Sequence, residues 1–179
     1  MYYSTTYLSP VGVLTLASNS EELVGLWVEG QKYHGGSIAG DLVPDDGLSV
    51  FSKVSSWLDR YFDGKKPPLT ELSLAPVGGE FRQGVWDILC RIPYGEVTTY
   101  GEIAKQMAVK MGKAAMSSQA VGGAVGHNPI SIIIPCHRVV GSSGSLTGYA
   151  GGLQTKIRLL ELEGVDMSRF FIPKNGTAL

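Results

Sequence analysis

A break in the middle of the sequence constrains the fold more than any other feature. Segment 65–79 holds three of the nine prolines and two adjacent glycines, and these residues disfavour regular helices and strands. Before the break β-forming runs predominate, whereas after it apolar residues recur mainly at helical spacing. We therefore expect two domains, residues 1–78 and residues 79–179.

The first domain is expected to be a small antiparallel sheet with one helix. Turn signals separate three β-rich runs that predict its strands: residues 2–8, 11–17 and 22–29. Residues 30–46 are rich in Gly and Asp and are expected to form a loop. In residues 48–62 apolar side chains recur at helical spacing, and Asp63-Gly64 ends this helix.

The second domain is expected to be mainly helical. Apolar spacing predicts four helices, at residues 81–92, 100–107, 118–126 and 153–163. The second and third of them have candidate N-caps, Thr98 or Thr99 and Ser117 or Ser118. These two helices have the outline of a helix-turn-helix, although most such helix pairs bind nothing. Residues 129–141 are expected to be extended and broken by Pro135.

Composition excludes several classes of protein. Hydrophobic residues make up 44% and charged residues 17% of the chain, which is ordinary for a globular protein. No apolar run approaches the ~20 residues of a membrane span, and the first residues lack the features of a signal peptide. We expect a cytoplasmic protein.

Cysteine and charge content add two constraints. Cys90 and Cys136 are too few for a disulfide framework, and no Cys/His cluster has the spacing of a zinc site. Cys90, on an apolar helix face, is expected to be a buried structural thiol. Residues 1–80 carry five basic against ten acidic side chains, and residues 81–179 carry ten against six. The basic half suits a polyanionic partner, but ordinary surface charge explains it equally well.

The reactive side chains gather where the apolar run ends. Pro135 is followed directly by Cys136, His137 and Arg138. A cysteine becomes a nucleophile when a nearby cation or base favours its thiolate. Neighbours in a strand point to opposite faces, so contact between Cys136 and His137 requires a turn or a bridging water. By itself such a pair is more often a core cysteine beside a surface histidine.

Several separated motifs in a fixed order give this pair a context. They are Tyr94-Gly95-Glu96-Val97, Ala120-Val121-Gly122-Gly123-Ala124, Asn128-Pro129, Pro135-Cys136-His137-Arg138-Val139, and Tyr149-Ala150-Gly151-Gly152 with Leu159-Leu160 and Glu163-Gly164. Together they resemble the 6-O-alkylguanine-DNA alkyltransferases, closely over residues 80–165 and loosely before them. The resemblance implies an α+β fold: a ribonuclease H-like N-terminal domain, and a C-terminal domain with a winged-helix-like helix-turn-helix.

The resemblance also implies a reaction and the residues that perform it. An alkyl group on the 6-oxygen of guanine passes irreversibly to Cys136, once per molecule. His137 takes the thiol proton through water, Glu163 orients His137, and Asn128 holds the turn that presents the cysteine. Tyr100 assists base extrusion and can protonate the departing guanine. Three residues are implied to line the pocket for the flipped base: Tyr149, Val139 and Ala150.

The implied partner is double-stranded DNA that carries the lesion, bound through its minor groove. Contacts are implied for Tyr100, Gly101, Ser118, Gln119, Ala120, Gly122, Arg138 and Ser142. Gln119 departs from the pattern, because relatives often carry an arginine that fills the gap left by the extruded base. No cofactor, metal, membrane or obligate protein partner is implied, and we expect a monomer.

Two other functions compete with this interpretation. A non-catalytic lesion binder of the alkyltransferase-like type would have replaced the acceptor cysteine, and Cys136 is present. A cysteine hydrolase would need an oxyanion hole and repeated turnover. Transcriptional regulation is not a competitor but an added role, and it would need an additional adaptor domain.

Overall fold

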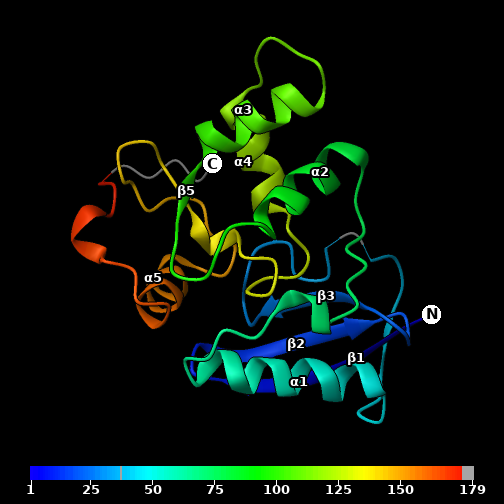
Figure 1. Cartoon of the computed structure of the whole chain (residues 1–179). Helices are drawn as coiled ribbons and strands as arrows, with labels where there is room; N and C mark the ends of the chain where they lie inside the picture. Colours follow the sequence, from blue (N-terminus) through cyan, green and yellow to red (C-terminus); the bar gives the residue numbers. More distant parts are fainter. Residues whose placement is uncertain (37, 175–179) are drawn as a thin grey trace. The chain divides into compact units, whose positions relative to one another are not determined.

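The computed structural model describes residues 1–36 and 38–174 (Figure 1). Contacts between residues divide the chain into two units. Unit 1 contains residues 1–78 together with residues 129–133, and unit 2 contains residues 79–128 and the chain from Ile134 onward. Within the described ranges, the helices are too short or too polar to cross a membrane.

Unit 1 is built on a four-stranded sheet with the order β3-β2-β1-β4. The three predicted antiparallel strands are confirmed as β1 (Tyr2–Ser9), β2 (Gly12–Ser18) and β3 (Leu23–Val28). A fourth strand, β4 (Leu42–Pro44), pairs in parallel with β1. The expectation of a loop throughout residues 30–46 was therefore wrong at residues 42–44. Because β4 is parallel to β1, the sheet contains both parallel and antiparallel strands. A strand of three residues is too short to show an alternating pattern.

One amphipathic helix packs on this sheet. Helix α1 (Ser49–Phe62) contacts β1 and β2 (Figure 1). It buries a single stripe of apolar residues: Val50, Phe51, Val54, Trp57, Leu58 and Tyr61. The predicted stop is confirmed, because Asp63 caps the helix and Gly64 follows with a positive φ of 81°. A short 3-10 helix, η1 (Leu69–Glu71), lies in the connection that follows.

Unit 2 is mainly helical, as predicted. Its helices are α2 (Glu80–Leu89), α3 (Tyr100–Lys110), α4 (Ser118–Gly126) and α5 (Leu153–Leu162), with the 3-10 helices η2 (Cys136–Arg138) and η3 (Met167–Arg169). Strand β5 (Thr98–Thr99), directly before α3, pairs in parallel with strand β6 (Val139–Val140), directly after η2.

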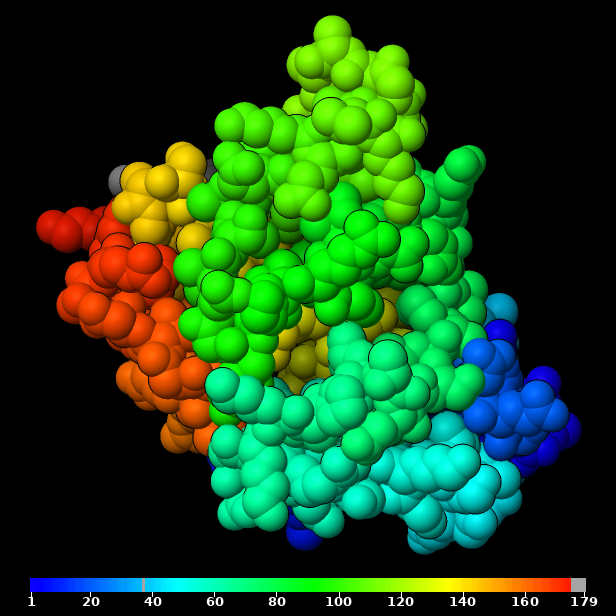
Figure 2. All heavy atoms as spheres, viewed as in Figure 1, coloured from blue at the N-terminus to red at the C-terminus, as the bar shows by residue number. Residues whose placement is uncertain are grey.

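Helices α2, α3 and α4 pack against one another. The predicted caps are confirmed, since Thr99 accepts a hydrogen bond from the N–H of Glu102, and Ser117 accepts from those of Gln119 and Ala120. The connection between α3 and α4 projects into solvent at the top of Figure 2.

The expected extended run at residues 129–141 was mostly wrong. Within it, Ile130 forms a bridge with Leu26 on the edge strand β3, and Val139 and Val140 form β6. The N–H of Leu26 donates to the carbonyl of Pro129 at 2.9 Å, and the N–H of Ser131 donates to the carbonyl of Leu26 at 3.0 Å. Beyond them the chain turns, with Ile132 at a φ of 72°. Pro129 and Pro135 flank the isoleucines, and a proline has no N–H to donate to a strand ladder. The apolar run is therefore buried as a turn and not as a strand.

Candidate active site

The reactive triplet lies on one turn of 3-10 helix. Cys136, His137 and Arg138 form η2, and their exposed fractions are 5%, 0% and 8%. A 3-10 helix turns about 120° per residue, so the three side chains do not alternate between opposite faces as they would in a strand. The turn that the sequence required is therefore present.

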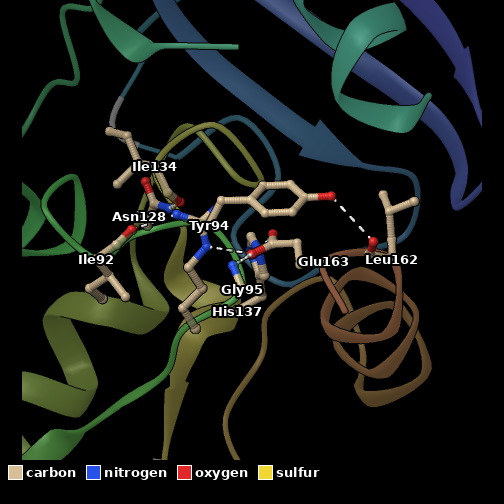
Figure 3. A network of polar contacts seen from close by, with 9 residues as sticks. Ile92, Tyr94, Gly95, Asn128, Ile134, His137, Leu162 and Glu163 are labelled. Atoms are coloured by element: carbon tan, nitrogen blue, oxygen red, sulfur yellow. Dashed lines mark hydrogen bonds and ion pairs between the residues drawn. The ribbon is translucent and has the colours of Figure 1, made fainter. Parts of the chain in front are cut away.

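His137 is hydrogen-bonded to Glu163. Its Nε2 lies 2.5 Å from Oε2 of Glu163, and both side chains are fully buried (Figure 3). Glu163 is the C-cap residue of α5, so the end of that helix fixes the carboxylate. The other ring nitrogen of His137, Nδ1, is buried and has no partner in the described structure. It is the ring atom available to take a proton.

The second oxygen of Glu163 has partners of its own. Oε1 accepts from the backbone N–H of Gly95 at 3.2 Å (Figure 3). It also accepts from Nε of Arg138 at 2.7 Å. Burial alone would raise the pKa of Glu163, but the hydrogen bonds and charges of His137 and Arg138 outweigh it and lower the pKa to about 2. Glu163 is an anion at neutral pH.

Burial sets the protonation of the reacting pair. It lowers the pKa of His137, and the hydrogen bond to Glu163 only partly opposes this effect. It raises the pKa of Cys136, against the influence of Asn128 and Lys156, which favour the thiolate. The resting site therefore holds a thiol and a neutral imidazole.

Asn128 lies where it can hold the segment that leads to the cysteine. It follows the C-cap of α4, and its side chain is buried. Its Nδ2 donates to the carbonyl of Ile134 at 2.8 Å (Figure 3). This bond closes the loop of residues 129–133 at its base, directly before Pro135 and Cys136.

Lys156 was not among the predicted site residues, but it links two segments of the site. Its Nζ is buried and donates to the carbonyls of Val139 and Thr147 at 2.6 and 2.8 Å. Burial lowers its pKa to about 8, with the charge of Cys136 acting in the opposite direction. One signal was available: Lys156 shares the buried face of α5 with Leu159 and Leu160, where an apolar residue is usual.

The two tyrosines of the predicted site lie near groups already described: Tyr100 at the carbonyl of Thr147, and Tyr149 at the ring of His137. The hydroxyl of Tyr100, a buried residue at the start of α3, donates to the carbonyl of Thr147 at 3.2 Å. Tyr149 lies edge-on to the ring of His137, with 6.5 Å between ring centroids. Val139 is buried in β6, and Ala150 is half-buried.

Two family models match successive parts of this chain. The DNA binding domain of 6-O-methylguanine DNA methyltransferase matches residues 80–165, and the ribonuclease-like domain of the same family matches residues 1–76. The chain belongs to the 6-O-methylguanine DNA methyltransferase family. Both the resemblance and the expected fold are thereby confirmed.

Relatives of this family are similar over most of their length. Proteins named methylated-DNA–protein-cysteine methyltransferase are 43% identical in Haemophilus influenzae and 44% identical in Methanosarcina barkeri, over 91% of this chain and 87% and 97% of theirs. A crystal structure of Mycobacterium tuberculosis OGT in complex with DNA has a TM-score of 0.77 at 43% identity and covers 94% of both chains. The O6-methylguanine-DNA methyltransferase of Pyrococcus kodakaraensis has a TM-score of 0.61 at 27% identity, over 92% of this chain and all of the other.

The residues with an expected DNA contact differ in exposure. Ser118, Gln119 and Ala120 are exposed on the first turn of α4, and Ser142 is exposed in a loop. Gly101 is half-buried, whereas Gly122 and Arg138 are buried.

Cys90 lies apart from this site. It is the C-cap residue of α2 and is half-buried, rather than lying within the helix face as expected. Burial is nonetheless the main cause that raises its pKa to about 11. Its thiol is unreactive at neutral pH.

Proposed function

We propose that this chain repairs DNA by moving a methyl or larger alkyl group from the 6-oxygen of guanine to Cys136. The observation that carries this assignment is the buried His137, whose Nε2 is held by Glu163 while Nδ1 has no partner among the described residues. An activated cysteine needs a base of this kind, oriented by a third group.

The chemical step is a displacement at the alkyl carbon. The Cys136 thiol gives its proton to Nδ1 of His137, through a water, and the sulfur forms a bond to the carbon. The bond between that carbon and the 6-oxygen breaks, and the guanine leaves with the electron pair. Tyr100 is the proton donor to the departing base, because burial raises the pKa of its phenol and keeps it protonated. The thioether has no good leaving group, so each molecule acts once.

The lesion reaches the cysteine only after it leaves the base stack. We assign minor-groove contact to the exposed first turn of α4, with Ser118, Gln119 and Ala120, and base extrusion to Gln119 and Tyr100. Small side chains let a helix backbone come close to the groove floor, and a flipped base needs a pocket, which Tyr149, Val139 and Ala150 would line.

The remaining assignments follow the same proposal. Residues 1–78 form the N-terminal α/β domain, and residues 79–179 form the DNA-binding and alkyl-acceptor domain. The protein works as a monomer in the cytoplasm, without a cofactor. Its partner is duplex DNA that contains 6-O-alkylguanine.

Intact-protein mass spectrometry tests this function. After incubation with duplex DNA that contains 6-O-methylguanine, the protein should gain one methylene, about 14 Da, on the peptide that holds Cys136. The Cys136→Ala variant should gain nothing, and the matched Cys90→Ala variant should react like the unsubstituted protein. Several turnovers per molecule, or label on another residue, would overturn the proposal.

A further inference from the structure

The side chain of Arg138 is held by contacts inside unit 2 and is not extended towards a DNA surface. Its Nε donates to Oε1 of Glu163 at 2.7 Å, and its Nη1 donates to the carbonyl of Ile92 at 2.6 Å. The guanidinium carbon lies 5.8 Å from the ring centroid of Tyr94. The side chain is only 10% exposed, so this cation is directed into unit 2 and towards the relay.

The partners of Glu163 are divided between its two oxygens. Arg138 and the N–H of Gly95 occupy Oε1, and His137 occupies Oε2. A planar carboxylate held at both oxygens cannot rotate about its terminal bond. Charge-assisted hydrogen bonds from arginine are among the stronger ones in proteins, so Arg138 is the dominant restraint on the first oxygen.

The charge on Glu163 decides which nitrogen of His137 carries the proton. An ionised carboxylate only accepts hydrogen bonds, so the Nε2 that faces it must be the N–H. Nδ1 then keeps its lone pair and can serve as the base. A protonated Glu163 could instead donate to Nε2, and the ring would move its own proton to Nδ1 and lose the base.

We propose that Arg138 is a positioning residue that locks the tautomer of His137 by holding Glu163 ionised and oriented. This role rests on the proposed function of Cys136 and His137 and differs from a contact with DNA. Among the described residues, the hydrogen bonds of Arg138 go to Glu163 and to the carbonyl of Ile92, so Arg138 acts through Glu163.

The other charged and titratable groups around His137 do not duplicate this role. Lys156 faces the ring from α5 but donates to the carbonyls of Val139 and Thr147. Cys136 precedes the ring in η2, and Tyr149 lies edge-on to it. Of the described ion pairs, only that with Arg138 gives Glu163 a permanently charged partner.

The experiment compares Arg138→Met and Arg138→Lys, with Arg91→Met as the matched control. Arg91 is an exposed arginine beyond the end of α2. The substrate is free 6-O-benzylguanine, which reacts without DNA. We expect Arg138→Met to slow transfer by about tenfold or more, Arg138→Lys to restore part of the rate because it keeps the charge, and Arg91→Met to change nothing.

Nitrogen-15 NMR of labelled histidine reads the tautomer directly. In the unsubstituted protein His137 should show a proton on Nε2 and none on Nδ1, and Arg138→Met should shift the ring towards the other tautomer. Removing the cation should also raise the pKa of His137, which Arg138 lowers, so the acid limb of the rate should move to higher pH.

Three outcomes would overturn the inference. In the first, Arg138→Met lowers affinity for duplex DNA but leaves the free-base rate intact, which indicates a phosphate contact. In the second, the tautomer and the acid limb stay unchanged although the rate falls, which indicates a role in folding alone. If Arg138→Met does not fold, Arg138→Lys is tested in its place. Lysine lacks the planar guanidinium group, so a full transfer rate with an unchanged tautomer in this variant would be the third outcome against the inference. Failure of the function itself is distinguishable, because the unsubstituted protein would then not be alkylated on Cys136.

Discussion

His137 and Cys136 are buried to a similar degree, but burial affects the two groups in opposite directions. It lowers the pKa of the imidazole and raises that of the thiol, because in each case it disfavours the charged form. Burial therefore preserves the base and suppresses the free thiolate. Reactivity must arise when both groups change charge together, with a substrate in place.

The lowered pKa of His137 predicts how the rate of alkyl transfer falls at acidic pH. The base works only when neutral, and its pKa is lowered from 6.5, so it stays neutral as the pH falls through the ordinary value. We expect transfer to free 6-O-benzylguanine to be nearly constant from pH ~8 to ~6.5 and to decline only below that range. A rate profile in which half of the activity is lost at pH 6.5 or above would show that His137 is not the buried base.

Gln119 predicts a difference between two substrates. It is exposed on the first turn of α4, where a side chain can enter the space left by an extruded base, and extrusion costs a few kcal/mol. An arginine is longer, charged and planar, so Gln119→Arg should raise duplex affinity and the rate on methylated duplex. The rate with free 6-O-benzylguanine should barely change. Equal changes on both substrates would assign Gln119 to the fold or the pocket.

At the scale of elements, the start of α4 gives a stability prediction. The Ser117 side chain accepts from two otherwise unpaired N–H groups of the first turn. Ser117→Ala should lower the free energy of unfolding by about 1 kcal/mol, measured by chemical denaturation. Ser118→Ala is the control, since Ser118 is exposed and is the first residue of the helix. Equal losses in both variants would mean that the cap contributes nothing.

Elements with strong local signals were the ones that the sequence predicted. The apolar stripe of α1 and the caps Thr99 and Ser117 depend on neighbours within a few residues, so they are visible locally. Strand β4 was missed because it is stabilised by pairing with β1 and not by its own three residues. The turn at Ile132 was missed because an apolar run between prolines has no diagnostic period.

The site could be predicted only in part, for a similar reason. The Cys-His-Arg triplet was visible as a local pattern, whereas its meeting with Glu163 came from the resemblance, across a separation of 26 residues. Nothing local indicates that Arg138 points inward, and the helical spacing that puts Lys156 on the apolar face of α5 does not show what its charge would bind. Both depend on tertiary partners, and the catalytic roles remain predictions.

At the scale of the whole molecule, the chain crosses between its units more than once. Residues 129–133 belong to unit 1, although Asn128 and Ile134, which flank them, belong to unit 2. The isoleucines at 130, 132 and 133 are at most 1% exposed. A cut in the chain between residues 78 and 79 therefore does not separate two self-sufficient pieces.

This arrangement predicts how a fragment behaves. The fragment of residues 79–179, produced alone, should be less soluble than the full chain and should react slowly, because three buried isoleucines and the hydrogen bonds to Leu26 lose their partners. Co-production with residues 1–78 should restore both properties, measured by size-exclusion chromatography and transfer rate. A monomeric, fully active lone fragment would contradict this expectation.

The pairing of residues 129–131 with β3 also has a consequence during synthesis. β3 is an edge strand, and an unpaired edge is a template for aggregation. On the ribosome β3 emerges about one hundred residues before the segment that pairs with Leu26, an interval on the order of 5–20 s at ordinary elongation rates. Before then, residues 73–75 cover one part of that edge by bonding to Leu23. The edge of β3 at Leu26 thus stays open in the nascent chain until a few residues before its reactive cysteine is made.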